Sequence, residues 1–218
     1  MTTKKTHALL LTLALAALGT SGARAELVKN GSFEANVING GIEQVNAVTG
    51  WTSSVAGNGA FEIQKGAAQG GVSGFNPYAY DGKQYLELNA AAMTTISQSI
   101  VTSTQGLYSL SFAYAGRPDT PNGTSSLMNV YWGATKLNAS PLIGLTNGGW
   151  STFSVTDLVA INASTLLRFE SIGPVSSPTY GSYLDAVSVK VSAVPEPASA
   201  ALLLLGIAGL ALSRRKKG

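Results

Sequence analysis

Between Glu26 and Val194 this sequence contains no stretch that keeps apolar residues at helical spacing for three turns. Short runs of aliphatic, aromatic and β-branched residues recur instead, each bounded by Gly, Asn, Pro or Asp. We expect strands at residues 27–34, 50–54, 61–65, 84–89, 95–101, 107–114, 127–137, 150–155, 165–172 and 182–191. This rhythm predicts an all-β sandwich, with its longest loops at 66–76, 117–126 and 173–181.

Two of these runs show period-two alternation clearly. In 107–114 large residues alternate with Ser and Ala, which predicts a central strand with one apolar face. In the last run the same period places Asp185 on the face shared by Val187 and Val189. A carboxylate on that face needs a partner.

The N-terminus has the parts of a secretory leader. Lys4 and Lys5 precede an apolar run from 8 to 18, and Ala23 and Ala25 form a small-x-small cleavage pattern. We therefore expect a signal peptide at 1–25 that signal peptidase removes, leaving Glu26 as the first residue. An uncleaved anchor is the alternative, although the apolar run is short for a membrane span.

The C-terminus carries a second apolar segment, at 198–212, followed by a basic tail at 213–218. Because Lys and Arg are retained on the cytoplasmic side, this order predicts a transmembrane helix whose preceding domain lies across the membrane. Directly before the helix, Pro195 and Pro197 flank Glu196 and hold the chain extended and accessible to a processing enzyme.

Composition limits the class of protein further. Of 14 basic residues, seven lie in the leader and tail, so residues 26–196 carry seven basic against 11 acidic residues, a net of −4. This net negative charge does not provide the basic surface that binding to nucleic-acid phosphates requires. Cysteine is absent, so a single domain at 26–193 must be stabilised by its hydrophobic core without disulfides.

The order of Pro195-Glu196-Pro197, an apolar segment, and a basic tail beginning at Arg214 and Arg215 resembles the PEP-CTERM sorting signal, over residues 194–218. This resemblance implies recognition by an exosortase, which would remove the helix and release the protein to the cell surface or the extracellular space. An ordinary single-span anchor with a Pro-rich stalk is the alternative.

The domain itself resembles the galactose-binding-like jelly rolls, which include carbohydrate-binding modules. The similarity lies in the order of LVKNGSFE (27–34), Gly50-Trp51, DGKQYLEL (81–88), ISQSI (96–100), GLYSLSF (106–112) and LDAVSV (184–189). The resemblance implies a structural calcium ion at Glu34 and Asp185, since carboxylate oxygens suit calcium. The alternative is that backbone amides or a tyrosine hydroxyl satisfy Asp185; Ala186 stands where the family often has a second Asp.

Sugar binding needs aromatic platforms beside polar side chains. Tyr78, Tyr80 and Trp132 are our candidate ligand-binding residues, whereas Trp51 and Trp150, which follow glycines near strand starts, are expected in the core. Tyr131 is a further aromatic candidate.

The residue types in the exported part of the chain allow few catalytic mechanisms. The only histidine, His7, lies in the leader, so residues 26–218 contain neither His nor Cys for nucleophilic catalysis or a zinc site. A glycosidase would need a carboxylate pair from among Glu43, Glu62, Asp81, Glu87, Asp119 and Glu170. We expect a non-catalytic surface protein that binds extracellular polysaccharide, with a structural biofilm component as the alternative.

Overall fold

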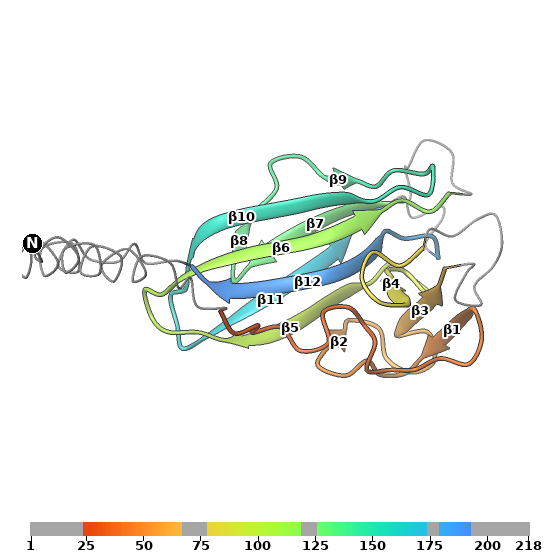
Figure 1. The fold of residues 1–218 in the computed structure, drawn as a ribbon, viewed down its shortest axis with the longest axis horizontal. Helices are drawn as coiled ribbons and strands as arrows, with labels where there is room; N and C mark the ends of the chain where they lie inside the picture. The colour runs from red at the N-terminus through yellow and green to blue at the C-terminus, as the bar shows by residue number, and fades with distance from the viewer. Residues whose placement is uncertain (1–23, 67–77, 119–125, 174–178, 193–218) are drawn as a thin grey trace, which may run out of the picture.

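Twelve strands build two antiparallel sheets in the computed structural model, which describes residues 24–66, 78–118, 126–173 and 179–192 (Figure 1). The first sheet has the order β1 (Ile42–Val45), β3 (Phe61–Lys65), β4 (Gln84–Glu87), β12 (Tyr183–Val191), β6 (Leu107–Ala115) and β10 (Ser151–Val159). The second has the order β2 (Thr52–Ser53), β5 (Thr95–Val101), β11 (Ser164–Ser171), β7 (Leu127–Trp132) and β8 (Thr135–Lys136), with β9 (Leu142–Ile143) paired to β7. The prediction of an all-β sandwich is confirmed.

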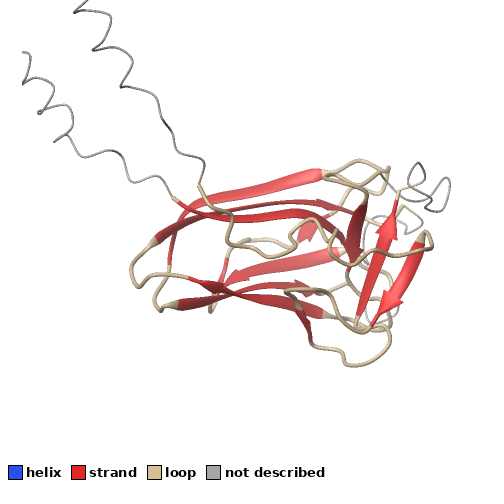
Figure 2. Ribbon diagram, turned by 60° about the horizontal axis from the view of Figure 1, so that its bottom comes forward, coloured by secondary structure: helices blue, strands red, loops and turns tan. Residues whose placement is uncertain are grey.

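The hydrophobic core lies between the two sheets, which appear as separate layers in Figure 2. The predicted alternation on β6 supplies a central part of it, because Leu110 and Phe112 point inward. The Phe112 ring stacks on Phe153 of β10 at 5.1 Å and meets Phe169 of the opposite sheet edge-on at 5.0 Å, both measured between centroids. Aromatic contacts of this kind add to the free energy gained by burial.

The expected strand at 27–34 is wrong. This segment runs beside β12, where the Val187 amide donates to the Gly31 carbonyl at 2.9 Å, but left-handed backbone at Asn30 (φ 54°) and Phe33 (φ 59°) turns it repeatedly. A Cβ on Gly31 would lie 1.9 Å from the Val187 carbonyl oxygen, so glycine permits this close approach. The first strand is instead β1, which the sequence pattern did not single out.

The expected strand at 127–137 divides into β7 and β8. Gly133 adopts a φ of 59° between them, so the chain turns back and Tyr131 pairs with Lys136. A left-handed glycine is the usual requirement of so short a connection.

A β-bulge in β12 overturns the expected orientation of Asp185. Asp185 lies opposite Ala113 and Ser188 opposite Ser111, so two residues of β12 face one of β6, and Ala186 takes a φ of 49°. The extra residue reverses the alternation. Asp185 therefore lies on the outer face of the sheet, while Val187 and Val189 remain in the core.

The two ends of the domain lie together, since the Leu27 amide donates to the Val189 carbonyl at 2.9 Å. Several predicted segments fall outside the described residues: leader residues 1–23 with Ala23, the segment with Pro195, Glu196 and Pro197, the apolar segment 198–212, and the tail with Arg214 and Arg215. Ala25 of the predicted cleavage pattern is described and exposed, and most of the predicted long loops are not described. Within the described ranges, no helix has the length and apolar character that a membrane crossing requires.

Candidate functional site

Strand register places two carboxyl groups directly opposite each other on the outer face of the first sheet. Glu62 of β3 pairs with Glu87 of β4, and Gln64 pairs with Tyr85 in the same way. Their neighbours Ile63 and Leu86 point into the core, so period-two geometry turns all four polar or aromatic side chains outward. All four are nonetheless buried.

A hydrogen-bonded network joins these side chains. The Gln64 amide nitrogen donates to Glu62 Oε1 at 2.6 Å and also to Glu87 Oε2. The Tyr85 hydroxyl donates to Gln64 Oε1 at 3.4 Å. Each buried polar group thus gains a partner, as burial requires.

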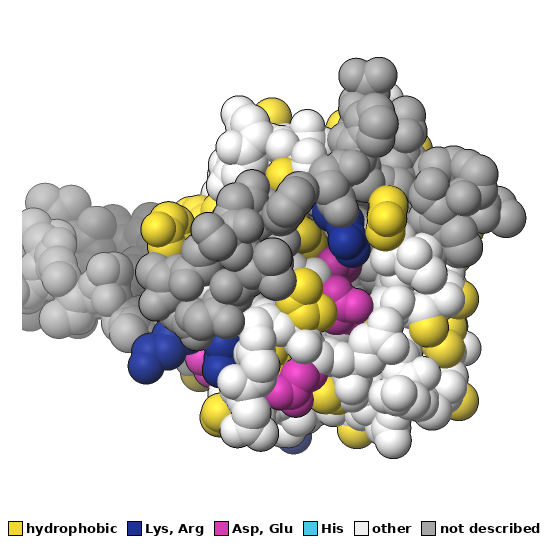
Figure 3. Space-filling model, turned by 90° about the vertical axis from the view of Figure 1, so that its right-hand side faces the viewer, with side chains coloured by type: hydrophobic (Ala, Val, Ile, Leu, Met, Phe, Trp, Pro, Cys, Tyr) yellow, Lys and Arg dark blue, Asp and Glu magenta, His cyan; other side chains and the backbone are white. Residues whose placement is uncertain are grey.

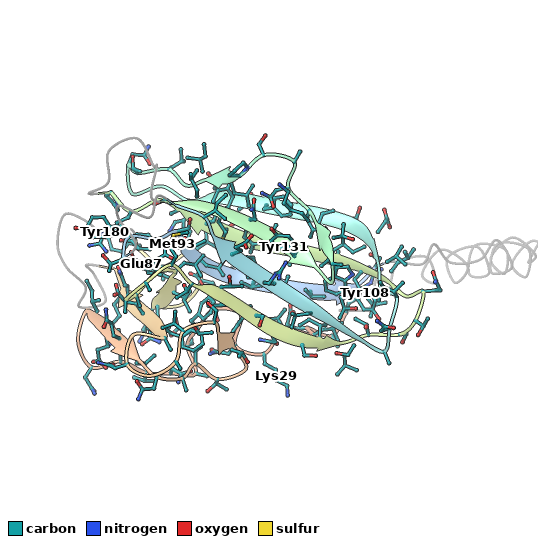
Figure 4. The ribbon with its side chains drawn as sticks, turned by 180° about the vertical axis from the view of Figure 1, so that it is seen from behind. Lys29, Glu87, Met93, Tyr108, Tyr131 and Tyr180 are labelled. Carbon is teal, nitrogen blue, oxygen red and sulfur yellow. The ribbon has the colours of Figure 1, made fainter. Side chains whose placement is uncertain are left out.

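Loops at one end of the sandwich complete this network with a cation. Arg117, which follows β6, forms an ion pair with Glu87 at 3.1 Å, and its guanidinium lies 4.2 Å from the centroid of the Tyr180 ring. The Gly181 amide donates to Glu87 Oε1 at 3.1 Å. We call Glu62, Gln64, Tyr85, Glu87 and Arg117 the polar cluster. Figure 4 shows Glu87 and Tyr180 together at the end of the molecule opposite Tyr108, and Figure 3 shows a basic side chain beside acidic ones at that end.

Burial governs the electrostatics of the cluster. Removal from water, together with the facing carboxylate of Glu62, raises the pKa of Glu87 well above its ordinary value, and Arg117 offsets only part of this effect. Burial also raises the pKa of the Tyr85 hydroxyl. Glu87 therefore retains its proton to a higher pH than an ordinary carboxyl group.

Exposed aromatic residues border the polar cluster. The side chains of Tyr78 and Tyr80 are 61% and 52% exposed, as expected for ligand-binding candidates. The Trp150 indole donates to the Tyr78 carbonyl at 2.8 Å, and its ring lies 6.1 Å from that of Tyr80 and 5.5 Å from that of Tyr85. We call Tyr78, Tyr80, Trp150 and Tyr180 the aromatic rim. Trp150 is only partly buried and belongs to this rim, contrary to its expected place in the core.

The two predicted calcium ligands both hold the loop that carries Tyr80. Asp185 Oδ2 accepts hydrogen bonds from the Tyr80 and Asp81 amides at 2.8 and 2.9 Å. Glu34 Oε1 accepts from the Lys83 and Gln84 amides, both at 2.6 Å. Burial raises the pKa of Asp185 to about 7, although the backbone amides of Asp81, Ala186 and Tyr80 act against this shift.

Backbone N–H groups aimed at a carboxylate oxygen satisfy it without a cation, so calcium at Glu34 and Asp185 stays a prediction. Within the described part of the chain, no three His, Cys, Asp or Glu side chains come together. The arrangement matches the alternative in which backbone amides satisfy Asp185.

The choice of Trp132 as a ligand-binding residue is wrong. Its side chain is 4% exposed, packs against Tyr108 at 5.6 Å and donates to the Val159 carbonyl at 3.0 Å. The hydrophobic effect and a satisfied indole N–H keep it in the core. Trp51 is buried, as expected.

Sequence reasoning missed Gln64, Arg117 and Tyr180. Arg117 and Tyr180 stand in turn-forming segments and Gln64 stands in an expected strand, so no local pattern distinguishes them. Glu62 and Glu87 were candidates within a set of six acidic residues. Strand register alone selects that pair.

Comparison with known proteins agrees with this architecture. Residues 26–190 match the family described as "Protein of unknown function (DUF642)". The chain belongs to the DUF642 family. Residues 193–217 of this DUF642 chain match the PEP-CTERM protein-sorting motif, which confirms that resemblance and marks an exported protein anchored at its C-terminus before processing. No curated protein matches the sequence.

Solved carbohydrate-binding modules resemble the DUF642 domain in fold. TmCBM61, solved in complex with β-1,4-galactotriose, aligns with 14% sequence identity and a TM-score of 0.51 over 77% of this chain and 99% of its own. CBM35 from Paenibacillus barcinonensis aligns with 18% identity and a TM-score of 0.41 over 70% of this chain and 100% of its own. The TmCBM61 match confirms the jelly-roll expectation, and its 14% identity bears on the fold alone.

Proposed function

We propose that this exported protein binds extracellular polysaccharide through the aromatic rim, without catalysing a reaction. The observation that carries the proposal is the position of Tyr80 and Trp150, whose rings border the buried polar cluster. Aromatic faces suit the apolar faces of sugar rings, and the guanidinium of Arg117, the most exposed member of the cluster, suits their hydroxyls. Arg117 and Tyr180 supply a second pairing of a polar group with a ring.

The fixed backbone beneath the rim supports a binding role. Asp185 and Glu34 hold the 80–84 loop from two sides through four backbone amides. A pre-ordered loop loses less conformational entropy when ligand binds, so affinity is gained without new contacts. We infer that these carboxylates position the aromatic rim rather than a calcium ion.

The geometry of Glu62 and Glu87 supports a non-catalytic role. Glycosidases hold their two carboxyl groups apart so that the scissile bond fits between them. Here one amide nitrogen of Gln64 bonds to both carboxyl groups, which leaves no space for a sugar between them. The pair is a buried, hydrogen-bonded part of the fold.

The sorting motif supports processing of the chain by an exosortase, and the N-terminal leader supports processing by signal peptidase. Signal peptidase would release the leader, and an exosortase would act near Pro195-Glu196-Pro197 at the outer face of the membrane. The domain would then reach the cell surface, where polysaccharide is available. An excess of acidic residues in the exported part opposes binding to nucleic acid.

Affinity electrophoresis in gels containing purified bacterial exopolysaccharide tests the proposal. We expect Tyr80→Ala and Trp150→Ala to abolish the retardation of the protein, while Tyr131→Ala, on the outer face of the opposite sheet, migrates like the wild type. Circular dichroism of each variant controls for folding. Absence of retardation on every glycan, with weaker biofilm cohesion after deletion of the protein, would favour a structural matrix component instead.

A further inference from the structure

Exposed apolar side chains gather at the end of the sandwich opposite the polar cluster. These side chains belong to strand ends and one loop. Backbone hydrogen bonds join the segments that carry them: the amides of Ser192, Ala160 and Thr102 donate to the carbonyls of Leu107, Gly106 and Ala163, respectively. Val159 pairs with Leu107, and Val101 with Ser164. We call this set the apolar end; its members are Val101, Leu107, Val159, Ile161 and Val191.

The exposure of these residues is high for large apolar side chains. Val101 is 80% exposed and Ile161 is 65% exposed. The apolar end draws on both sheets, since Leu107 and Val159 belong to the first sheet and Val101 to the second. Apolar side chains exposed together at one end of a domain are suited to contact with a partner or a membrane. The charged residues nearby are of both signs and give no strong electrostatic preference; they include Arg24, Glu26, Asp157 and Lys190.

The length of the chain beyond β12 identifies the partner. Strand β12 ends at Val191, inside the apolar end, and the apolar segment of the sorting motif starts at Ala198. Five residues lie between Ser192 and Ala198, and the six residue steps that join them span at most about 22 Å in a fully extended chain. Before processing, the apolar end is therefore held close to the membrane in which the anchor lies.

We propose that the apolar end rests on the outer surface of the membrane while the C-terminal anchor is in place. A short tether keeps the domain at high effective concentration beside the lipid, so a weak apolar contact is sufficient. Aliphatic side chains at the headgroup boundary are removed from water, which favours this orientation over random tumbling. The inference is independent of glycan binding.

This orientation has a consequence for the polar cluster. Strand β12 runs from Tyr183, which pairs with Glu87, to Val191 in the apolar end. Eight residue steps of a strand span roughly 25 Å. The polar cluster and its aromatic rim would then point away from the membrane, toward the extracellular polymer.

Single cysteines test the proposal directly, because the chain contains none of its own. Ile161→Cys and Val101→Cys report on the apolar end, while Ile143→Cys and Val37→Cys, with exposures of 58% and 80%, are matched controls away from it. Each full-length variant is labelled with an environment-sensitive fluorophore and reconstituted into phosphatidylethanolamine/phosphatidylglycerol vesicles containing spin-labelled lipid.

We expect blue-shifted emission and several-fold stronger quenching by the spin-labelled lipid at positions 161 and 101 than at 143 and 37. A label at Leu107 should lose this quenching in a Val101→Ser/Ile161→Ser background and keep it in a Val37→Ser/Ile143→Ser background. Equal quenching at all four positions would overturn the proposal. A blue shift that grows with protein concentration and resists lipid quenching would overturn it in favour of contact with a second copy.

Discussion

Asp185 fixes the backbone of Tyr80, a residue 105 positions away, through a hydrogen bond of 2.8 Å from the Tyr80 amide. The same carboxylate oxygen accepts from Asp81 at 2.9 Å, and its partner oxygen accepts from the Ala186 amide at 2.7 Å. A buried carboxylate on a bulged strand thereby decides where an exposed aromatic ring stands. This relationship connects the stability of the fold to the proposed binding surface.

Asp185→Asn should weaken both stability and glycan retention. The substituted amide turns an N–H donor toward backbone N–H groups, and each unsatisfied buried group costs about 1–3 kcal/mol. Urea denaturation measures the loss, and affinity electrophoresis measures retention. Asp157→Asn, at an exposed position, is the matched control.

The same experiment decides the role of calcium. If backbone amides satisfy Asp185 and Glu34, calcium and chelator leave the midpoint of wild-type unfolding unchanged. A midpoint that rises with calcium and falls with chelator, with the difference lost in Asp185→Asn, would show a metal site instead.

The raised pKa of Glu87 predicts a specific dependence of stability on pH. The folded state binds this proton more strongly than the unfolded state does, so the free energy of unfolding declines as the pH rises above the ordinary value of 4.5. We expect Glu87→Gln to reduce that decline above pH 4.5, because its amide carries no titrating proton. Asp185 retains a similar contribution in this variant, since its pKa is also raised.

Glu43→Gln is a control in which the free energy of unfolding should depend on pH in the opposite direction. Amides of Gly40 and Asn39 lower the pKa of Glu43, so its contribution is present above the ordinary carboxyl range and is lost as the pH falls through it. Thermal unfolding across pH measures both variants. A Glu87→Gln curve parallel to that of the wild type would contradict the raised pKa of the buried Glu87.

Substitutions of Trp132 and Trp150 should distinguish a core residue from a residue of the binding surface. Trp132→Ala removes a buried ring from the core and should cost about 3–5 kcal/mol of unfolding free energy, while the folded fraction still binds glycan. Trp150→Phe should cost less stability and should reduce retention, since the indole bond to Tyr78 is lost. Equal losses of retention per folded molecule would place Trp132 at the site after all.

Gly181→Ala should disturb the polar cluster by steric contact. A Cβ at this position would lie 1.7 Å from the Leu88 carbonyl oxygen, so the backbone must move and the Gly181 amide must leave Glu87. We expect a loss at or above about 1–3 kcal/mol, the usual cost of overpacking. Gly148→Ala, where the added Cβ meets no atom within 4 Å, should cost only the strain of its positive φ; chemical denaturation of both compares them.

Sequence patterns alone determined the class of the fold and the nature of the two ends. Alternation on 107–114 and the lack of helical spacing are local properties, so β6 and the sandwich could be predicted from them. The sorting motif is likewise a local order of residues, which the family match confirms at 193–217. Exposure of Tyr78 and Tyr80 followed from their Gly- and Pro-rich surroundings.

The tertiary structure decided which of these residues meet. Glu62 faces Glu87, and Arg117 reaches the pair, only because register and loop placement bring distant segments together. One extra residue in β12 moved Asp185 from the expected core face to the outer face, and such a bulge leaves no periodic mark in the chain. Trp132 is in the core for a similar reason: the partner of its indole, the Val159 carbonyl, is supplied by a strand of the opposite sheet. Contacts between distant segments depend on the packed sandwich, whereas local periodicity does not.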